Sequence, residues 1–410
     1  MANGISRRQF VERSARLAVL AGLSGSILSA CGSSSDNGSG DGGGGDTIPL
    51  ARLDNPVTLP DNGIEAVASG QEPESGTLRV LNYADYINPE TQAAFEAEMG
   101  TTLEITVYDT EDKLLSNLRN DSLTFDLVMG ATTLQLPKFV VGELIQPLNQ
   151  EYLPNFSNVL ATLQSPYYDV GSQYTAPYVV YTTGIAYRRD KIDDAAFASD
   201  DAWKLLWDPA NKGFAGVLDD SREALTLGMY YRGVTDTNTG DPAILDAAEA
   251  DIKALVAATD ARFDILAWQQ IPEGSSHIHQ AWSGDMIAAQ YYLPEGTDAE
   301  VLGYWKPSRT TVANDFFVIP ARSERPVLAH ALINYLLDPA NAQFNFEFVG
   351  YQPALTSPTL DDLIAAELVP PHLQSTLVSD EDVANGFRLD ALALDVENLW
   401  TDAYSRIRSG

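Results

Sequence analysis

Short apolar segments alternate with amphipathic ones along most of the chain after residue 75. The first pair is an apolar strand at 77–83 and a helix at 88–100. Asn88 is placed to cap that helix, Pro89 occupies its first position and Gly100 ends it. The alternation continues with a strand, a helix and a strand at 102–108, 111–121 and 125–130. This order predicts parallel βαβ units, in which ligands bind beyond the carboxyl ends of the strands.

The same alternation continues through the rest of the chain. Further strands are predicted at 182–189, 214–220, 284–292 and 315–321. Further helices are predicted at 201–213, 221–233 and 325–339. About 330 residues follow the N-terminal region, which exceeds what one hydrophobic core usually organises, so an α/β fold with two lobes is expected.

The N-terminal residues have the pattern of an export signal rather than of a folded segment. In residues 1–30, Arg7 and Arg8 precede an apolar stretch that is too short for a dedicated membrane span, which indicates export by the twin-arginine route. The stretch ends at "LSAC", which resembles a bacterial lipobox and predicts that Cys31 becomes the lipid-modified first residue of the mature chain.

Two segments without regular periodicity separate this signal from the fold. Residues 31–46 are a Gly/Ser tract, which predicts a flexible tether. Residues 47–75 contain four prolines and predict an extended arm lying on the surface. Together with a lipid on Cys31, these segments predict an extracytoplasmic protein anchored to a membrane.

The chain is strongly acidic, with 25 Lys and Arg against 57 Asp and Glu and a net charge of −32. Residues 1–30 carry four Arg and one Glu, which leaves 21 basic and 56 acidic residues and a charge of −35 after their removal. Such a surface argues against nucleic acid or anionic lipid as a partner and favours the approach of cations. Only seven residues are Lys, a composition typical of proteins that work in salt.

Motifs for covalent or metal chemistry are missing from the sequence. Cys31 is the single cysteine, and there is no G-x-S-x-G elbow, P-loop or G-x-G-x-x-G turn. His277 and His279 could share a face with Glu273 as metal ligands, but an ordinary polar loop is the favoured interpretation. His330 is predicted to lie on the surface of its helix. The sequence therefore predicts no enzyme, no metal and no cofactor.

The stretch "GVLDDSREAL" at 216–225 holds three carboxylates between an apolar strand and a helix. Asp220 and Glu223 have the spacing of a capping box, so the local pattern does not distinguish a helix start from a site for a positive group. Several tyrosines are also predicted at strand ends, namely Tyr83, Tyr86, Tyr291 and Tyr292. Carboxylates beside aromatic faces suit an organic ammonium ion.

Several stretches in order along residues 76–410 resemble the spermidine/putrescine-binding proteins of ABC importers. They are "VLNYADYINPET", "FDLVMGATT", "WKLLWDPANKGFAGVLDDSREAL", "GDMIAAQYY", "ANDFFVIPA", "AHALINYLLDPANA" and "VGYQPA". The resemblance implies a two-lobed fold of the type II periplasmic-binding-protein kind, each lobe a mostly parallel sheet flanked by helices, with the ligand in the cleft between them. One lobe would comprise 76–181 and 315–357, and the other 182–314 and 358–410.

The resemblance also implies a set of ligand-binding residues. They are Tyr83, Tyr86, Thr133, Asp220, Glu223, Tyr292, Asp315, Tyr351 and Asp390. Asp219 is left as the helix cap, and Arg222 is expected to face solvent. The chain departs from the family at Ala131, Thr133 and Ala313, where larger or more polar side chains are expected, so the site would have a smaller aromatic wall.

The favoured function is a monomeric, lipid-anchored binding protein that captures a polyamine and delivers it to an ABC permease. A binding protein for another amine-bearing solute, such as an amino-acid derivative, is an alternative within the same architecture. That alternative requires an arginine in the cleft to pair with a ligand carboxylate. A secreted hydrolytic lipoprotein and a purely structural one are the alternatives from other classes.

Overall fold

The computed structural model describes residues 50–409. The predictions for the export signal, Cys31 and the Gly/Ser tether concern residues outside this range. Residues 50–76, in the predicted arm, contain no helix, and their only described β pairing is the bridge between Arg52 and Asn55.

The first sheet forms where the opening alternation predicts it. Strands β1 (Thr77–Asn82), β2 (Thr102–Val107) and β3 (Leu127–Ala131) are parallel, with β1 between the other two. Helices α2 (Pro89–Met99) and α3 (Glu111–Arg119) make the crossovers. The side chain of Asn88 accepts the N–H of Glu90, and Gly100 ends α2 at a φ of 64°. These predicted elements and the α2 boundaries are confirmed.

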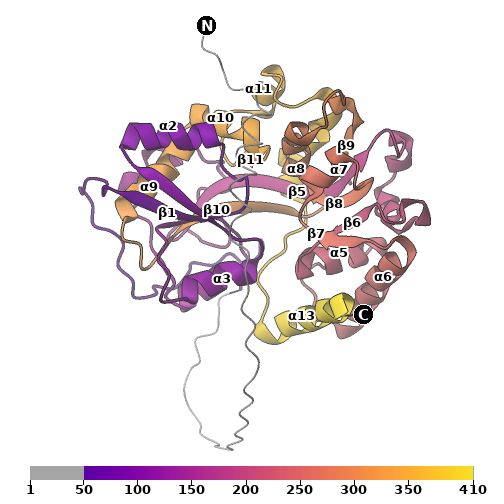
Figure 1. Cartoon of the computed structure of the whole chain (residues 1–410). Coiled ribbons are helices and arrows are strands. Elements are labelled where there is room, and N and C mark those ends of the chain that lie inside the picture. The colour runs from indigo at the N-terminus through magenta and orange to yellow at the C-terminus, as the bar shows by residue number, and fades with distance from the viewer. Residues whose placement is uncertain (1–49, 410) are drawn as a thin grey trace, which may run out of the picture. The chain divides into compact units, whose positions relative to one another are not determined.

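Two long antiparallel strands join this sheet to a second one. Strands β5 (Ala176–Arg188) and β10 (Val312–Pro320) cross the middle of Figure 1, and β10 pairs with β3. Residues 176–182 of β5 pair with β10, whereas residues 183–187 pair with β8 (Ile278–Trp282). Every residue of β5 is buried, so this strand belongs to the cores on both sides.

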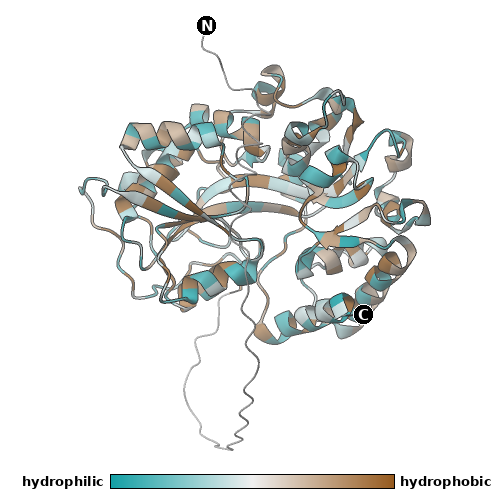
Figure 2. Cartoon of the chain, viewed as in Figure 1, coloured by the Kyte–Doolittle hydropathy of each residue, from teal (hydrophilic) through white to brown (hydrophobic). Residues whose placement is uncertain are grey.

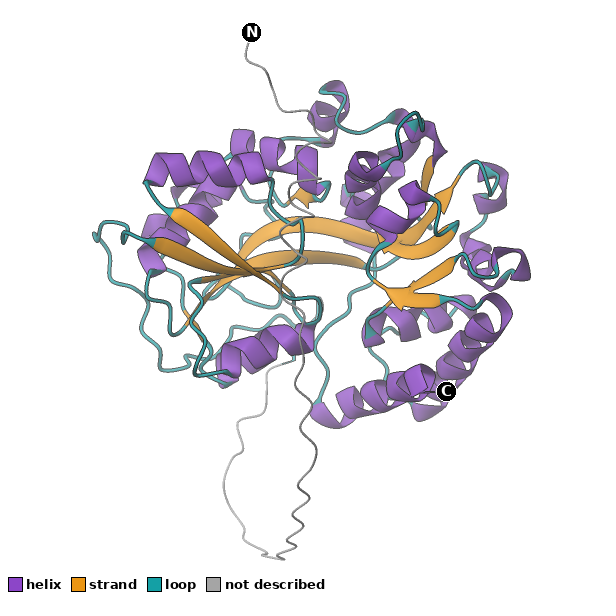
Figure 3. Ribbon diagram, viewed as in Figure 1, coloured by secondary structure: helices purple, strands orange, loops and turns teal. Residues whose placement is uncertain are grey.

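The second sheet again has parallel strands. Strand β6 (Ala215–Leu218) lies between β7 (Arg262–Asp264) and β8 and is parallel to both. Strand β9 (Leu302–Trp305) pairs antiparallel with β5. The strand order is β2-β1-β3-β10-β5-β8-β6-β7, parallel at both ends and antiparallel in the middle. Helices cover the strands on both faces (Figure 3), with apolar residues concentrated on the strands (Figure 2).

Helices α5 (Ser221–Tyr231), α6 (Pro242–Thr259) and α13 (Leu394–Ser409) pack together beside the second sheet. Trp400 of α13 is fully buried there. The remaining elements are α4 (Leu136–Val141), β4 (Ile145–Gln146), α7 (Ala267–Glu273), α8 (Ser283–Ala288), α9 (Pro326–Leu336), α10 (Pro339–Val349), β11 (Gln352–Pro353), α11 (Leu360–Ala365) and α12 (Asp380–Asn385).

Three predictions about elements and burial are wrong. Residues 284–292 are helix α8 followed by a 3₁₀ turn, because a short apolar run does not distinguish strand from buried helix. The segment 201–213 forms 3₁₀ turns rather than an α-helix. His330 is buried, and its Nε2 accepts the backbone N–H of Asn149.

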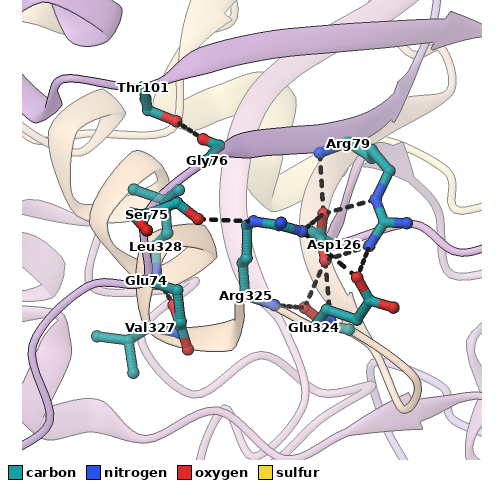
Figure 4. Close-up of polar contacts among 11 residues, drawn as sticks. Glu74, Ser75, Gly76, Arg79, Thr101, Asp126, Glu324, Arg325, Val327 and Leu328 are labelled. Atoms are coloured by element: carbon teal, nitrogen blue, oxygen red, sulfur yellow. Dashed lines mark hydrogen bonds and ion pairs between the residues drawn. The ribbon is translucent and has the colours of Figure 1, made fainter.

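The arm is joined to the first sheet by a polar network (Figure 4). The carboxylate of Glu74 accepts the N–H of Leu328 in the first turn of α9 at 2.8 Å. Arg325 donates to the carbonyl of Ser75, and its guanidinium lies 3.8 Å from the fully buried carboxylate of Asp126. Oδ2 of Asp126 also accepts a hydrogen bond from Nε of Arg79 at 3.1 Å. Because Asp126 is satisfied by these donors, the network serves the fold and leaves no unpaired group for a ligand.

None of the helices within residues 50–409 combines the length and the apolar composition needed to cross a membrane.

Candidate functional site

A cavity of about 180 Å³ lies where segments from both sheets meet. The loops after β1, β2 and β3 line one side of it, and the segments after β6 and β8 line the other. This is the strand edge at which the βαβ pattern places a ligand.

The lining of the cavity is strongly acidic. Its carboxylate residues are Asp85, Asp109, Glu111, Asp219, Asp220, Glu223, Asp285 and Asp315. Arg388 is the single basic residue among the described residues of the lining. Low-dielectric walls lined by one sign of charge concentrate ions of the opposite sign, so the cavity is arranged for a cation.

Asp315 lies on β10 and is held by two tyrosine hydroxyls. Tyr86 donates to its Oδ2 at 2.7 Å, and Tyr181 donates to its Oδ1 at 2.9 Å. Burial raises the pKa of Asp315 to about 7, although both hydrogen bonds favour the ionised form. The tyrosines orient the carboxylate but supply no positive charge to balance it.

Glu223 lies in the first turn of α5 and is buried. Its Oε1 accepts the hydroxyl of Thr183 at 2.9 Å and the indole N–H of Trp282 at 3.0 Å. Burial, followed by the charge of Asp220, raises the pKa of Glu223 to about 7. Like Asp315, it is fixed by neutral donors and lacks a cationic partner within the described part of the chain.

Asp220, rather than Asp219, caps α5. Its Oδ1 accepts the N–H groups of Arg222 and Glu223 at 2.8 and 2.9 Å. Burial raises the pKa of Asp220. Asp219 instead accepts the hydroxyl of Tyr404, so the prediction that Asp219 is the cap is wrong.

The aromatic residues of the cavity contact one another edge to face. The ring centroid of Tyr86 lies 5.8 Å from that of Tyr83 and 5.2 Å from that of Tyr351. Tyr292 lines the same cavity, and its hydroxyl donates to Oδ2 of Asp85 at 2.8 Å. Ring faces beside carboxylates form walls suited to a methylene chain with charged ends.

Sequence reasoning missed several residues of the lining, among them Glu111, Trp282 and Asp285. Tyr351 donates to Oδ1 of Asp285 at 2.7 Å, while the buried Oδ2 has no hydrogen-bond partner. Burial raises the pKa of Asp285 to about 7. Trp282 ends β8 and Asp285 lies in α8, so a correct prediction of the strand at 278–282 would have placed both residues at a strand end.

Thr133 and Asp390 differ in their relation to the cavity. Thr133 belongs to the lining, and its hydroxyl donates to the carbonyl of Leu389. Asp390 does not line the cavity; its Oδ1 accepts the hydroxyl of Tyr167 at 2.6 Å. Of the predicted ligand-binding residues within 50–409, Asp390 is thus the one that the fold does not bring to the cavity wall.

Two smaller expectations are also decided by the structure. Arg222 is buried rather than solvent-facing, donates to the carbonyls of Thr237 and Asp390, and lies 4.5 Å over the ring of Trp400. Ala313 lines the cavity, whereas Ala131 is in the core.

No group of three or more potential metal ligands occurs among residues 50–409. His277 stacks on Phe214 with ring centroids 3.9 Å apart, and His279 is fully buried. The structure therefore does not bring a metal site together at these histidines.

The family described as bacterial extracellular solute-binding protein matches residues 90–370, more than half of the chain. The chain belongs to this family. A family of solute-binding proteins agrees with the prediction of a binding protein and not an enzyme, and places the chain outside the cytoplasm.

Curated relatives in the family cover most of the chain. It is 27% identical over 342 residues to the spermidine/putrescine-binding periplasmic protein of Escherichia coli strain K12, covering 82% of this chain and 93% of that protein. It is 26% identical over 352 residues to a putrescine/agmatine-binding protein of Pseudomonas aeruginosa, covering 82% and 92%.

Solved structures share the fold. The substrate-binding protein PotD of a spermidine/putrescine ABC transporter from Streptococcus pneumoniae matches with a TM-score of 0.64 at 23% identity, covering 82% of this chain and 99% of that one. The Tp0655 lipoprotein of Treponema pallidum matches with a TM-score of 0.67 at 18% identity, covering 81% and 99%. These matches confirm the predicted α/β fold of the two-lobed periplasmic-binding-protein kind.

Proposed function

We propose that this protein captures a polyamine of the spermidine or putrescine type outside the cytoplasm and delivers it to an ABC permease. The observation that carries the proposal is the imbalance of charge in the cavity, where eight acidic residues face one arginine. Glu223, Asp285 and Asp315 are buried and form no ion pair within residues 50–409, so an ammonium group would give these three carboxylates a charge partner. The relatives named for spermidine, putrescine and agmatine support the same ligand class.

The ligand-binding residues in this proposal follow from the geometry. Glu223 and Asp315 bind ammonium groups, assisted by Asp220, while Tyr83, Tyr86 and Tyr351 contact the methylene chain. The hydroxyls and the indole N–H that hold the carboxylates leave their remaining oxygen lone pairs for the ligand. Thr133 and Tyr292 complete the wall, and Asp390 acts from behind it by holding Tyr167.

The alternative ligand, an amine that also carries a carboxylate, lacks a partner for that carboxylate. Arg388 is the one guanidinium of the described lining, and its Nη atoms donate to the carbonyls of Val383, Gly386 and Phe387. Arg222 is likewise occupied by backbone carbonyls and by Asn238. The cavity therefore favours amines without an acidic group.

A thermal-shift screen tests this ligand class, because a ligand that binds only the folded state raises the melting temperature. Spermidine, putrescine and agmatine are expected to raise it, whereas glutamate and maltose are expected to leave it unchanged. A rise with glutamate or maltose and none with the amines would overturn the proposal.

The attachment of the protein to a membrane is a separate part of the proposal. Export through the twin-arginine signal at Arg7 and Arg8 and lipidation of Cys31 would hold a monomer at the membrane surface by residues 31–46. In an expressing host, labelled fatty acid is expected to be incorporated into the wild type but not into Cys31→Ser, and the variant should appear in the soluble extracytoplasmic fraction. Equal labelling of both proteins would refute lipidation at Cys31.

A further inference from the structure

Glu111 is a carboxylate of the cavity that the proposed site does not use. It is the first residue of α3, just beyond the carboxyl end of β2, and it lines the cavity together with Thr132 from the loop after β3. The hydroxyl of Thr132 donates to its Oε1 at 2.9 Å. Its side chain is thus held at the same strand edge as the residues after β1.

The other oxygen of Glu111 is unsatisfied. Oε2 is buried and has no hydrogen-bond partner within the described residues, and no lysine or arginine there forms an ion pair with Glu111. The N-terminus of α3 favours a negative side chain through the helix dipole, but it donates no hydrogen bond to Oε2 of Glu111. Because a buried unpaired carboxylate oxygen is costly, its retention in a cavity wall indicates a donor that the chain does not provide.

The charged surroundings of Glu111 are also negative. Three acids raise its pKa by their negative charge, namely Asp112, Asp220 and Asp315. Its own charge in turn raises the pKa of Tyr83 and Tyr108. Burial, with a smaller effect from these acids, raises the pKa of Glu111 to about 8. Ala313 and Thr133, at positions where the resemblance implies larger side chains, also line this cavity.

We propose that Glu111 binds an additional ammonium group of the ligand and so selects amines with three or more cationic nitrogens over diamines. This inference rests on the proposed polyamine function. A diamine is neutralised by Glu223 and Asp315 alone, whereas a triamine also occupies Oε2 of Glu111. In the empty cavity the Glu111 carboxyl holds a proton near neutral pH, and the arriving ammonium group displaces it to solvent.

Calorimetric titration of wild type and Glu111→Gln with spermidine and with putrescine tests the proposal. The variant is expected to bind spermidine at least about tenfold more weakly while its putrescine affinity changes by less than about threefold, since a charge-assisted hydrogen bond is lost only with the triamine. Glu104→Gln removes the same charge from an exposed position on β2 away from the cavity and is expected to change neither affinity.

Titration near pH 7 in two buffers of different ionisation enthalpy adds a readout that a structural role of Glu111 would not change. Wild type is expected to release more protons on binding spermidine than Glu111→Gln does. Unchanged spermidine affinity and proton release in the variant, or an equal loss for both amines, would overturn this inference while leaving the polyamine function in place. If wild type bound neither amine, the proposed function would fail, and the role of Glu111 with it.

Discussion

Glu223 illustrates why the residues of the cavity require a cation. It is 5% exposed, and its carboxylate accepts hydrogen bonds from Thr183 and Trp282 but forms no ion pair within the described chain. Neutral donors compensate part of the lost hydration, yet they leave the charge itself unbalanced. The same holds for Asp315 between its two tyrosines.

Replacing Glu223 by Gln is expected to weaken spermidine binding by between about tenfold and a hundredfold. The substitution preserves the shape and one acceptor oxygen, so the loss reports the charge, and a hydrogen bond to a charged group contributes about 1.5–3 kcal/mol. Calorimetry measures the change. Glu98→Gln, on the exposed face of α2, is the matched control and should bind as wild type does. Equal affinities of all three proteins would show that Glu223 is not a ligand residue.

The stability of the empty protein is expected to fall as the pH rises from about 4.5 to about 7. Burial raises the pKa of Asp315 and of Asp285 from 3.8 to about 7, so in this window the folded chain holds protons that the unfolded chain has lost. Stability then decreases with pH, because the folded state binds more protons. Urea unfolding across this range should give a steeper decline for wild type than for Asp315→Asn. Identical slopes would contradict the raised pKa of Asp315.

The resemblance predicted Glu223, Asp315 and Tyr86 because their motifs lie in contiguous, ordered stretches of sequence. It did not predict Glu111 or Asp285, whose function depends on burial of one oxygen and on which neighbours donate to the other. Such properties arise only when loops distant in sequence pack together. The pattern at 216–225 likewise could not show that Asp220 would be both the cap of α5 and part of the cavity wall.

At the scale of elements, the cavity depends on where helices begin. α5 starts directly after β6, so its first turn carries Asp220 and Glu223 to the cavity. The α2 boundaries followed from its cap, proline and glycine, which are local signals. The error at 284–292 had a different origin, since β8 ends at Trp282 and the apolar run that follows it is helical. Tertiary burial, not local pattern, distinguishes these two structures.

Two substitutions of Asp220 separate its roles in α5. Asp220→Asn keeps an acceptor for the N–H groups of Arg222 and Glu223, so it should retain stability but lose amine affinity. Asp220→Ala removes the cap as well and should lower the free energy of unfolding by about 0.5–2 kcal/mol. Urea unfolding and calorimetry give the two quantities. Unchanged amine affinity in Asp220→Asn would restrict Asp220 to capping.

In the whole molecule, strands β5 and β10 join the two sheets, and the cavity lies where segments of the two sheets meet. A hydrogen bond between distant segments lies in its wall, from the hydroxyl of Tyr292 to Asp85. The prediction that the lobes comprise 76–181 with 315–357 and 182–314 with 358–410 stays a prediction. The change of pairing partner within β5 occurs between residues 182 and 183.

The net charge of −32 complements the acidic cavity, because a negative molecule attracts cations from a distance and added salt screens that attraction. Composition alone indicated this preference for cations. It could not indicate the number of ammonium groups, since that depends on how many carboxylates the fold buries without a partner.

Calorimetric titration with spermidine decides whether the acidic cavity binds a polyamine. Saturable binding of one spermidine per chain is expected, with a Kd of about 1 μM or lower, together with competition by putrescine and none by glutamate. If spermidine, putrescine and agmatine all failed to bind at millimolar concentration, the proposed function would be wrong.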